Sequence, residues 1–485
     1  MRLSGGWGAA SCVGVALGFV GAPVDAQWWK DPFNTGQMTS PAPDKPWESS
    51  APLPTIAPLA NAESLPSDQP LTLPELTEFG LRNNPRTRQA WFAARAAAAA
   101  VGMAKGDDFP NITGSLAFQR QRPVSGTSGA ASPWLNRYGP AISFSYTLYD
   151  FGLGDDRTEA AEYRLLAANL AQNRVLQDVM FQIEQSYYQL IGTEALVRVN
   201  ERSLKNVETV LDAARRRRES GVATSGDVFR AETQVAQAQL VLTRSRGEFE
   251  KSRGVLSTAL GLATNSSVRV QTLSAPPQIQ PVVSSINEFL ERAKATRPDL
   301  VAAEAQVRAA KASAEAAAKV GLPSIELVGS YGINEYTSNW HPDRPSTRPQ
   351  SYTLNVRIPI FSGFKDTYQI RQAQAQAEQA EAARDVLYRQ TQLEVWQAYH
   401  DLQTVTTSLK TTGAQVRSAE QTAQAVLARY QSGFGTILDL ITAQQDEANA
   451  RTQQIQSYLD WYTVLARLNY TLGANKLIPA TKEKK

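Results

Sequence analysis

The sequence predicts a mixed α/β membrane protein in which each chain contributes four transmembrane strands and several very long helices. Three observations predict this fold class. The chain begins with an export signal, yet no later apolar stretch is long enough to cross a membrane as a helix. Four short segments alternate apolar and polar residues with a period of two. The same order of elements occurs twice, at an offset of about 212 residues.

Residues 1–26 have the pattern of a secretory signal peptide. Arg2 supplies the positive charge, residues 13–20 form a short apolar core, and residues 24–26 fit a small-residue cleavage site. Cys12 leaves lipidation open, but it precedes most of the apolar core, so we favour simple cleavage. Because Cys12 is the only cysteine of the sequence, the cleaved chain would contain none.

The charge balance argues against a nucleic-acid-binding protein. A formal net charge of only +3 gives no strong field for nucleic acid, so no nucleic-acid partner is expected. Residues 27–70 are rich in Pro, Ser and Ala without periodicity, which indicates an N-terminal extension. Without a transmembrane helix, a membrane role requires a β-barrel or a surface helix.

The internal repeat is defined by five landmarks that agree to within one residue. Each half contains a proline that restarts a helix, a proline before a strand, a glycine turn, an aspartate after the turn and a Leu-Gly pair. The matched positions are Pro85 with Pro298, Pro110 with Pro323, Gly221 with Gly433, Asp227 with Asp439, and 260–261 with 472–473.

Each repeat is predicted to contain a broken helix, two strands, a long helix and a shorter return helix. In the first repeat (71–269) we expect a helix at 76–108 broken at Asn84-Pro85, strands at about 111–120 and 141–149, a long helix at 153–218 and a return helix at 226–261. After an equatorial linker (270–285), the second repeat (286–473) has a helix at 286–320 broken at Arg297-Pro298, strands at about 324–334 and 351–361, a long helix at 364–431 and a return helix at 437–472, followed by a tail (474–485).

The two long helices are unusual in length. Both are rich in Ala, Gln, Glu and Arg, and each would span on the order of 100 Å. Helices of this length are typical of coiled coils. Each return helix is about half as long. We expect two such shorter helices, stacked end to end, to run antiparallel to each long helix. Helix 286–320 is expected to continue helix 226–261, and helix 76–108 to continue helix 437–472.

Four strands cannot close a barrel, because about eight is the smallest useful number. Open strand edges are not tolerated in lipid. Identical copies of the chain are therefore expected to complete one barrel, although the residues alone do not fix the number of copies.

The ordered landmarks resemble the TolC family of outer-membrane efflux channels. The order NPR, FP, strand pair, long helix, ESG, TSGD, LG returns as RPD, LP, strand pair, long helix, QSG, TILD, LG, over roughly residues 71–473. The resemblance implies a homotrimer with a 12-stranded transmembrane β-barrel, continued by a long α-helical coiled-coil periplasmic tunnel. It implies a location in outer-membrane lipid, extending into the periplasm. It also implies two partners, a periplasmic adaptor (membrane fusion) protein and an inner-membrane pump.

The turns between the long and return helices are the candidate working site. Gly221 and Gly433 fit left-handed helix caps, and Asp227 and Asp439 fit capping boxes. The resemblance implies a second role for these residues. Asp227 and Tyr430 would bond between neighbouring hairpins, and Asp439 would be one of the acidic residues that form a ring at a periplasmic gate. Two positions depart from the TolC pattern, which has a linking arginine at the position of Gly435 and a second aspartate at that of Thr442.

A basic run precedes the first of these turns. It is favoured as a solvated helix end, with docking to an adaptor as the alternative, and consists of Arg215, Arg216, Arg217 and Arg218. His341 and His400 have no neighbours at metal-ligand spacing. We expect no metal, no cofactor and no enzymatic activity.

Three functions are compatible with this pattern. The preferred one is an outer-membrane exit duct of a tripartite efflux system, which conducts substrates passively. The outlet of a type I protein-secretion system would look the same in sequence. A periplasmic coiled-coil scaffold is the rival from another class, and it predicts no strands with a period of two.

Overall fold

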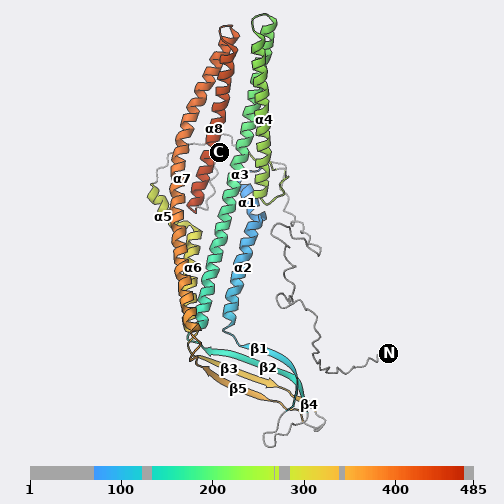
Figure 1. Cartoon of the computed structure of the whole chain (residues 1–485), viewed down its shortest axis with the longest axis vertical. Helices are drawn as coiled ribbons and strands as arrows, with labels where there is room; N and C mark the ends of the chain where they lie inside the picture. Colours follow the sequence, from blue (N-terminus) through green and yellow to red (C-terminus); the bar gives the residue numbers. More distant parts are fainter. Residues whose placement is uncertain (1–69, 123–133, 267, 272–284, 338–344, 474–485) are drawn as a thin grey trace, which may run out of the picture. The chain divides into compact units, whose positions relative to one another are not determined.

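The computed structural model describes residues 70–122, 134–266, 268–271, 285–337 and 345–473 (Figure 1). The chain divides into two units, Met1–Asn61 and Ala62–Lys485, and all described residues belong to the second. The expected signal peptide, the C-terminal tail, His341 and most of the N-terminal extension and linker lie outside the described residues.

The second unit has the same order of elements in both halves. The helices and strands are α1 Leu73–Asn83, α2 Pro85–Gly106, β1 Asn111–Gln121, β2 Leu135–Tyr149, α3 Leu153–Glu219, α4 Ser225–Ala259, α5 Ile286–Thr296, α6 Pro298–Lys319, β3 Ser324–Gly332, β4 Glu335–Thr337, β5 Gln350–Arg357, α7 Lys365–Gln431 and α8 Ile437–Thr471.

Three strand boundaries differ from those expected. Strand β2 begins at Leu135, six residues before the expected start at 141, and passes through Pro140. The strand expected at 324–334 is interrupted, so that β3 is followed by the short β4. Strand β5 ends at Arg357 because Pro359 follows and cannot donate a ladder hydrogen bond.

The strands form one antiparallel sheet with the order β1-β2-β3-β5, and β4 pairs with β2. The register aligns apolar residues across all four strands on one face, where Ile112 lies opposite Phe144, Phe144 opposite Gly329, and Gly329 opposite Tyr352. On the other face the corresponding row consists of Thr113, Ser143, Ser330 and Ser351. The two faces of the sheet therefore differ in character along these rows.

The apolar face is open to solvent in the single chain. Leu116 is 83% exposed and Ile112 71% exposed, on the edge strand β1. Tyr352, 72% exposed, lies on the opposite edge strand β5. Among the described residues, no strand pairs with the outer edge of β1 or of β5.

The shorter helices line up along the long ones (Figure 1). Helix α3 contacts both α4 and α2, while α7 contacts both α8 and α6. The side-chain amide of Asn84, between α1 and α2, donates to the Ala259 carbonyl at the end of α4 over 2.9 Å. The hydroxyl of Thr296, at the end of α5, donates to the Leu472 carbonyl beyond α8.

The expected pairing of the shorter helices is therefore wrong. Helix α4 is continued by α2 of its own repeat rather than by α5 and α6, and α8 is continued by α6 rather than by α2. Glycines permit both junctions. Gly261 and Gly473 have φ of +77° and +65°, and a Cβ atom would lie 2.7 Å from the Asn83 oxygen or 2.8 Å from the Thr296 oxygen.

A buried ionic cluster lies where α6 begins. Arg297 is only 2% exposed, and its guanidinium donates to Asp299 and, over 2.8 Å, to Glu394 on α7. Burial acts to raise the pKa of the Asp299 carboxyl, but the hydrogen bonds and charge of Arg297 outweigh it and hold that pKa below its ordinary value.

The same cluster reaches helices α3 and α8. The guanidinium of Arg174 lies 4.0 Å from the centre of the Tyr470 ring and 3.7 Å from the Asp299 carboxylate. The Tyr470 hydroxyl donates to Asp178 over 2.8 Å. Four helices are thus joined at one level by groups whose charges compensate one another.

We predict that Arg297→Met lowers the free energy of unfolding by about 3–5 kcal/mol, because it leaves the partly buried Glu394 carboxylate without its cation and Asp299 with only the more distant Arg174. The matched control is Arg308→Met, which breaks an exposed pair with Glu304 and should cost at most about 1 kcal/mol. Urea unfolding of both variants in detergent measures the difference. Equal losses in the two variants would contradict a structural role of the cluster.

Candidate functional site

The candidate site consists of the two helix-hairpin turns, between α3 and α4 and between α7 and α8, which lie far from the sheet (Figure 1). Gly221 and Gly433 have φ of +75° and +87°, a left-handed conformation that suits glycine. In the first turn the amides of Val222 and Ala223 donate to the Arg217 carbonyl, and in the second those of Phe434 and Gly435 donate to the Arg429 carbonyl. The two turns therefore share one backbone design.

Both expected aspartates close capping boxes. The Thr224 hydroxyl donates to the Asp227 carboxylate over 2.8 Å, while the Asp227 amide donates to the Thr224 hydroxyl. Thr436 and Asp439 repeat this arrangement, also with a hydroxyl–carboxylate distance of 2.8 Å. Hydrogen bonds from the Thr224 amide and hydroxyl lower the pKa of Asp227. Only one of the two Asp227 oxygens is used in this cap.

The four arginines of the basic run have different surroundings. Arg215 pairs with Glu232 across the first hairpin over 2.9 Å, and both side chains are exposed. Arg216 and Arg218 are also exposed. Only Arg217 is half-buried, because its side chain crosses from the first hairpin to the second.

Arg217 contacts Tyr430 in two ways. Its Nη1 donates to the Tyr430 carbonyl over 2.8 Å, and its guanidinium carbon lies 4.6 Å from the centre of the Tyr430 ring. Tyr430 is 6% exposed and belongs to an apolar cluster that includes residues of both hairpins, namely Val210, Leu211, Ala214, Val228, Ala231, Tyr430, Ile437, Leu440 and Ile441. The two hairpins of one chain are therefore packed together near their turns.

The bond expected between Asp227 and Tyr430 is not formed within one chain, as far as the described residues show. Gly435, at a position where the TolC pattern has an arginine, has a steric reason to be glycine. A Cβ atom there would lie 2.9 Å from the Tyr430 backbone nitrogen. The cation near this turn comes instead from Arg217 of the other hairpin, a contact that the sequence analysis did not identify.

The turns also expose apolar side chains that the sequence analysis did not single out. Phe434 is 84% exposed, Val222 66%, Phe229 64% and Leu438 53%. They lie within eight residues of the turn glycines Gly221 and Gly433. Exposed apolar groups of this kind mark sites of protein contact when they gather in a patch.

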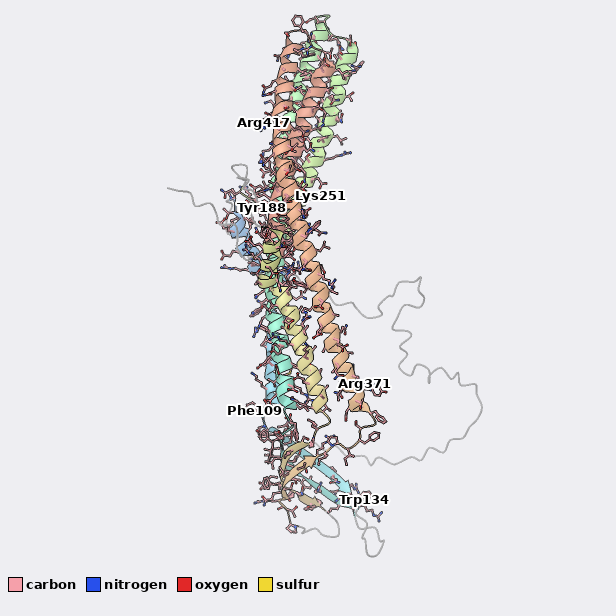
Figure 2. The ribbon with its side chains drawn as sticks, turned by 90° about the vertical axis from the view of Figure 1, so that its left-hand side faces the viewer. Phe109, Trp134, Tyr188, Lys251, Arg371 and Arg417 are labelled. Atoms are coloured by element: carbon pink, nitrogen blue, oxygen red, sulfur yellow. The ribbon has the colours of Figure 1, made fainter. Side chains whose placement is uncertain are left out.

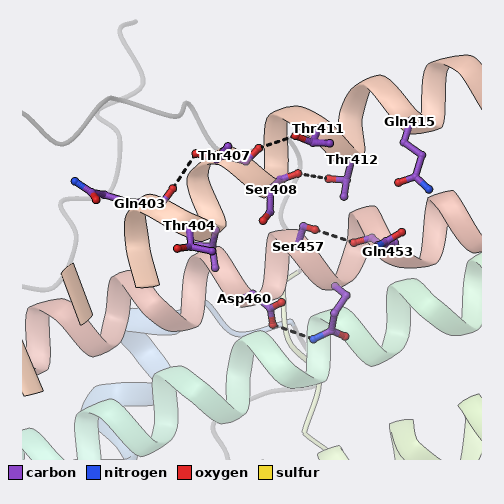
Figure 3. Close-up of a pocket in the computed structure, with 12 residues that line it drawn as sticks. Gln403, Thr404, Thr407, Ser408, Thr411, Thr412, Gln415, Gln453, Ser457 and Asp460 are labelled. Atoms are coloured by element: carbon purple, nitrogen blue, oxygen red, sulfur yellow. Dashed lines mark hydrogen bonds between the residues drawn. The ribbon is translucent and has the colours of Figure 1, made fainter. Parts of the chain in front are cut away.

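A polar cavity of about 750 Å³ lies between α7 and α8 (Figure 3). Most of its threonine and serine hydroxyls bond within their own helices, as Thr407 does to the Gln403 carbonyl and Ser457 to the Gln453 carbonyl. Its single carboxylate, Asp460, accepts a bond from Gln456. Among the described residues that line the cavity, no nucleophile is paired with a base.

Neither a metal site nor a helical membrane span is found among the described residues. No group of three or more His, Cys, Asp or Glu side chains is placed to hold a metal ion there. His400 packs beside Trp396, with 4.4 Å between ring centres. In the same part of the chain, no helix combines the length and apolar character needed to cross a membrane.

Comparison with known proteins identifies one family. The family described as outer membrane efflux protein matches residues 80–262 and 289–474. The chain is 26% identical over 387 residues to Protein CyaE of Bordetella pertussis, and the aligned region covers 79% of this chain and 80% of that protein. It is 26% identical over 381 residues to outer membrane protein OprJ of Pseudomonas aeruginosa, covering 77% and 78%. It is 23% identical over 426 residues to proteases secretion protein PrtF of Dickeya chrysanthemi, covering 84% and 89%.

Solved structures show the same fold. The outer-membrane channel OprN matches with a TM-score of 0.74 at 22% identity, covering 83% of this chain and 90% of that one. CusC matches with a TM-score of 0.72 at 19% identity, covering 86% and 99%. The arrangement of sheet and paired helices is therefore that of known outer-membrane channels.

We predict that Thr224→Ala destabilises the first turn of α4 by about 0.5–2 kcal/mol, because the capping box is lost. Amide hydrogen exchange over residues 225–228 measures this local opening. Thr233→Ala, one to two turns further along α4, is the control and should leave those amides unchanged. Because the pKa of Asp227 is lowered in the fold, its contribution is present above about pH 4 and is lost as the pH falls further. The difference between parent and Thr224→Ala should therefore shrink at pH 3, and a constant difference would contradict the role of the carboxylate.

Proposed function

Because this chain belongs to the outer membrane efflux protein family, we propose that three copies form one exit duct that conducts substrates passively through the outer membrane. The observation that carries the proposal is the sheet, which has one exposed apolar face and two outer edges that no described strand pairs with. Backbone groups at an open edge cannot be satisfied by lipid, so edge must pair with edge between copies. Three copies of β1, β2, β3 and β5 would give twelve strands.

In this duct the apolar face would meet lipid and the face of serines and threonines would line the lumen. Such alternation is the pattern of membrane barrels. Phe109 lies where α2 meets the sheet and Trp134 lies at the far end of the sheet (Figure 2). They are 71% and 50% exposed. Aromatic side chains at both ends of an apolar face suit the two membrane–water interfaces.

We predict opposite results for two adjacent substitutions on β5. Leu354→Arg puts a cation on the apolar face and should prevent assembly in the outer membrane, at a cost of about 2–4 kcal/mol near the bilayer midplane. Thr353→Arg, on the other face, should assemble and change the single-channel conductance in planar bilayers. Normal membrane assembly of Leu354→Arg would rule out the proposed orientation of the sheet.

The hairpin turns are proposed as the periplasmic gate. In a ring of three chains, six hairpins would meet around one axis. Asp227 has a carboxylate oxygen outside its cap, and the Tyr430 hydroxyl makes no hydrogen bond with the described residues. These two groups can therefore bond between neighbouring chains, while Asp439 would add negative charge near the opening.

We predict that Tyr430→Phe combined with Asp227→Asn raises the single-channel conductance, because it removes the bond between chains but keeps the aromatic ring. Thr436→Val weakens a cap at the same level without touching that bond, and its conductance should stay at the parental value. If the double variant conducts like the parent, Tyr430 and Asp227 do not form the gate.

An adaptor and an inner-membrane pump are proposed as partners. The exposed apolar residues of the turns, Val222, Phe229, Phe434 and Leu438, offer a contact surface for an adaptor. Arg216 and Arg218 beside them would favour an acidic partner.

The outlet of a type I protein-secretion system is the second candidate. Its support is the 23% identity to PrtF, whose name describes the secretion of proteases. A similar identity relates the chain to the toluene efflux pump protein TtgC of Pseudomonas putida. Because relatives are named for such different cargo, we propose that the pump, rather than the duct, selects the substrate. The scaffold alternative predicts no sheet, whereas the described residues contain one.

A further inference from the structure

Arg120 is a charged residue on the apolar face of the sheet. On β1 it follows Leu116 and Phe118 with the period of two, and the register sets it opposite Asn136 of β2. Phe118 is 71% exposed, and the Arg120 side chain is exposed as well. An arginine on a lipid-facing surface is costly at the bilayer midplane but nearly neutral at a membrane–water interface. On a sheet that faces lipid, Arg120 therefore has to lie near an interface.

The length of β1 places Arg120 at such an interface. The 11 residues of β1 cross about 29 Å of membrane when the strand is tilted by about 40°. The apolar band of outer-membrane barrels is about 25 Å tall. Arg120 is the last residue but one of β1, at the end of the sheet where Trp134 lies and far from Phe109 and the helices (Figure 2). Because the helices extend into the periplasm, this end of the sheet faces the outside of the cell.

The Arg120 guanidinium is held over an indole ring. Its carbon lies 4.9 Å from the centre of the Trp134 ring, a cation–π contact that covers one face of the guanidinium. The N–H groups lie in the guanidinium plane, so they can donate to a further acceptor, and their fork matches two oxygens of a phosphate. Glu335 lies on the same face two strands away, and it forms no ion pair with Arg120 in the described part of the chain.

The two ends of β1 carry charges of opposite sign. Asp107 and Asp108 precede the strand beside Phe109, whereas Arg120 and Arg122 lie at its outer end, and all four charged side chains are exposed. The outer leaflet of the outer membrane consists of lipopolysaccharide, whose lipid A headgroup carries phosphate groups, while the inner leaflet consists of phospholipids. Basic residues at a membrane interface attract anionic headgroups. The cations of β1 therefore lie at the leaflet with the phosphorylated glycolipid.

We propose that Arg120, held over Trp134, binds a phosphate group of lipid A at the outer end of the sheet. The inference rests on the proposed function, because it requires the apolar face to meet lipid. The phosphate compensates the charge of Arg120, and the amphipathic Trp134 ring suits the boundary between headgroup and acyl chains. In a ring of three chains the site occurs three times around the barrel.

Arg137 provides a matched control on the opposite face. The register sets it opposite Gln119, the residue before Arg120, and its guanidinium donates to Gln119 over 2.7 Å. It therefore lies at nearly the same height as Arg120, but on the face that is proposed to line the lumen. Removal of either arginine changes the charge of the protein by the same amount.

The test titrates the assembled protein in mild detergent with diphosphoryl lipid A. Native mass spectrometry measures the bound fraction. Monophosphoryl lipid A and phosphatidylethanolamine are the comparison lipids, and inorganic phosphate is the competitor. Single-channel conductance is recorded on the same variants as a separate measure of the duct.

Arg120→Gln should lower the affinity for diphosphoryl lipid A by about tenfold, because a charge-assisted contact with phosphate is lost. Arg120→Lys keeps the charge but not the planar fork, so its affinity should lie between the two. Arg137→Gln should keep the parental affinity, and Arg120→Gln should keep the parental conductance. The parent should prefer diphosphoryl lipid A to both comparison lipids. Inorganic phosphate at the same concentration should not displace the lipid, because a free ion has no acyl chains to contact the apolar face.

The outcomes separate this inference from the proposed duct. Parental lipid A affinity in Arg120→Gln, together with parental conductance, would overturn the lipid contact and leave the duct standing. Equal losses of affinity in Arg120→Gln and Arg137→Gln would overturn it as well, because binding would then depend only on total charge. Displacement of lipid A by an equal concentration of inorganic phosphate would reveal a site for the free ion and would also contradict the inference. A loss of affinity in Arg137→Gln alone would mean that the polar face meets lipid, which would count against the proposed orientation of the sheet.

Discussion

The outer edges of strands β1 and β5, which no described strand pairs with, are the constraint on which the rest of this structure depends. Strands β1 and β5 each leave a row of backbone donors and acceptors without partners among the described residues. The face beside those edges exposes Ile112, Leu116 and Tyr352. In water such edges favour pairing with other chains, and in lipid their backbone groups cannot be satisfied. Oligomerisation therefore follows from hydrogen bonding, and the helices inherit the symmetry that it imposes.

The helical part consists of one arrangement of helices that occurs twice. In each half, a long helix is covered by a return helix and a shorter helix placed end to end. A glycine with positive φ after the return helix lets it end against the helix break before Pro85 or Pro298. The two copies are not identical in chemistry. Asn84 makes a neutral bond to the Ala259 carbonyl at its break, whereas Arg297 forms a buried ionic cluster at the equivalent place. The turns show a similar asymmetry, because the second hairpin has Tyr430 at the position where the first has Arg218. The internal repeat thus gives a framework on which adjacent contacts can differ in strength.

Much of this architecture could be predicted from the sequence, because it depends on local patterns. Prolines, period-two alternation and the Leu-Gly pairs indicate where elements begin and end. The choice of which short helix continues which return helix was predicted wrongly, since element length and direction fit both pairings and only the contacts of Asn84 and Thr296 decide between them. The partners of Arg297 and Arg217 could not be predicted either, because Glu394 and Tyr430 are distant in sequence. The sequence nevertheless contains a signal for the contact of Arg217. The repeat matches RRESG (217–221) with RYQSG (429–433), so that the aromatic Tyr430 stands where the first hairpin has the cation Arg218.

The central claim is that identical chains complete one barrel by pairing the outer edges of β1 and β5. Native mass spectrometry of the protein, extracted from outer membranes in mild detergent, tests this claim most directly. The account predicts a single assembly with three times the mass of the mature chain. A monomer as the main species under conditions that preserve other outer-membrane oligomers would contradict it.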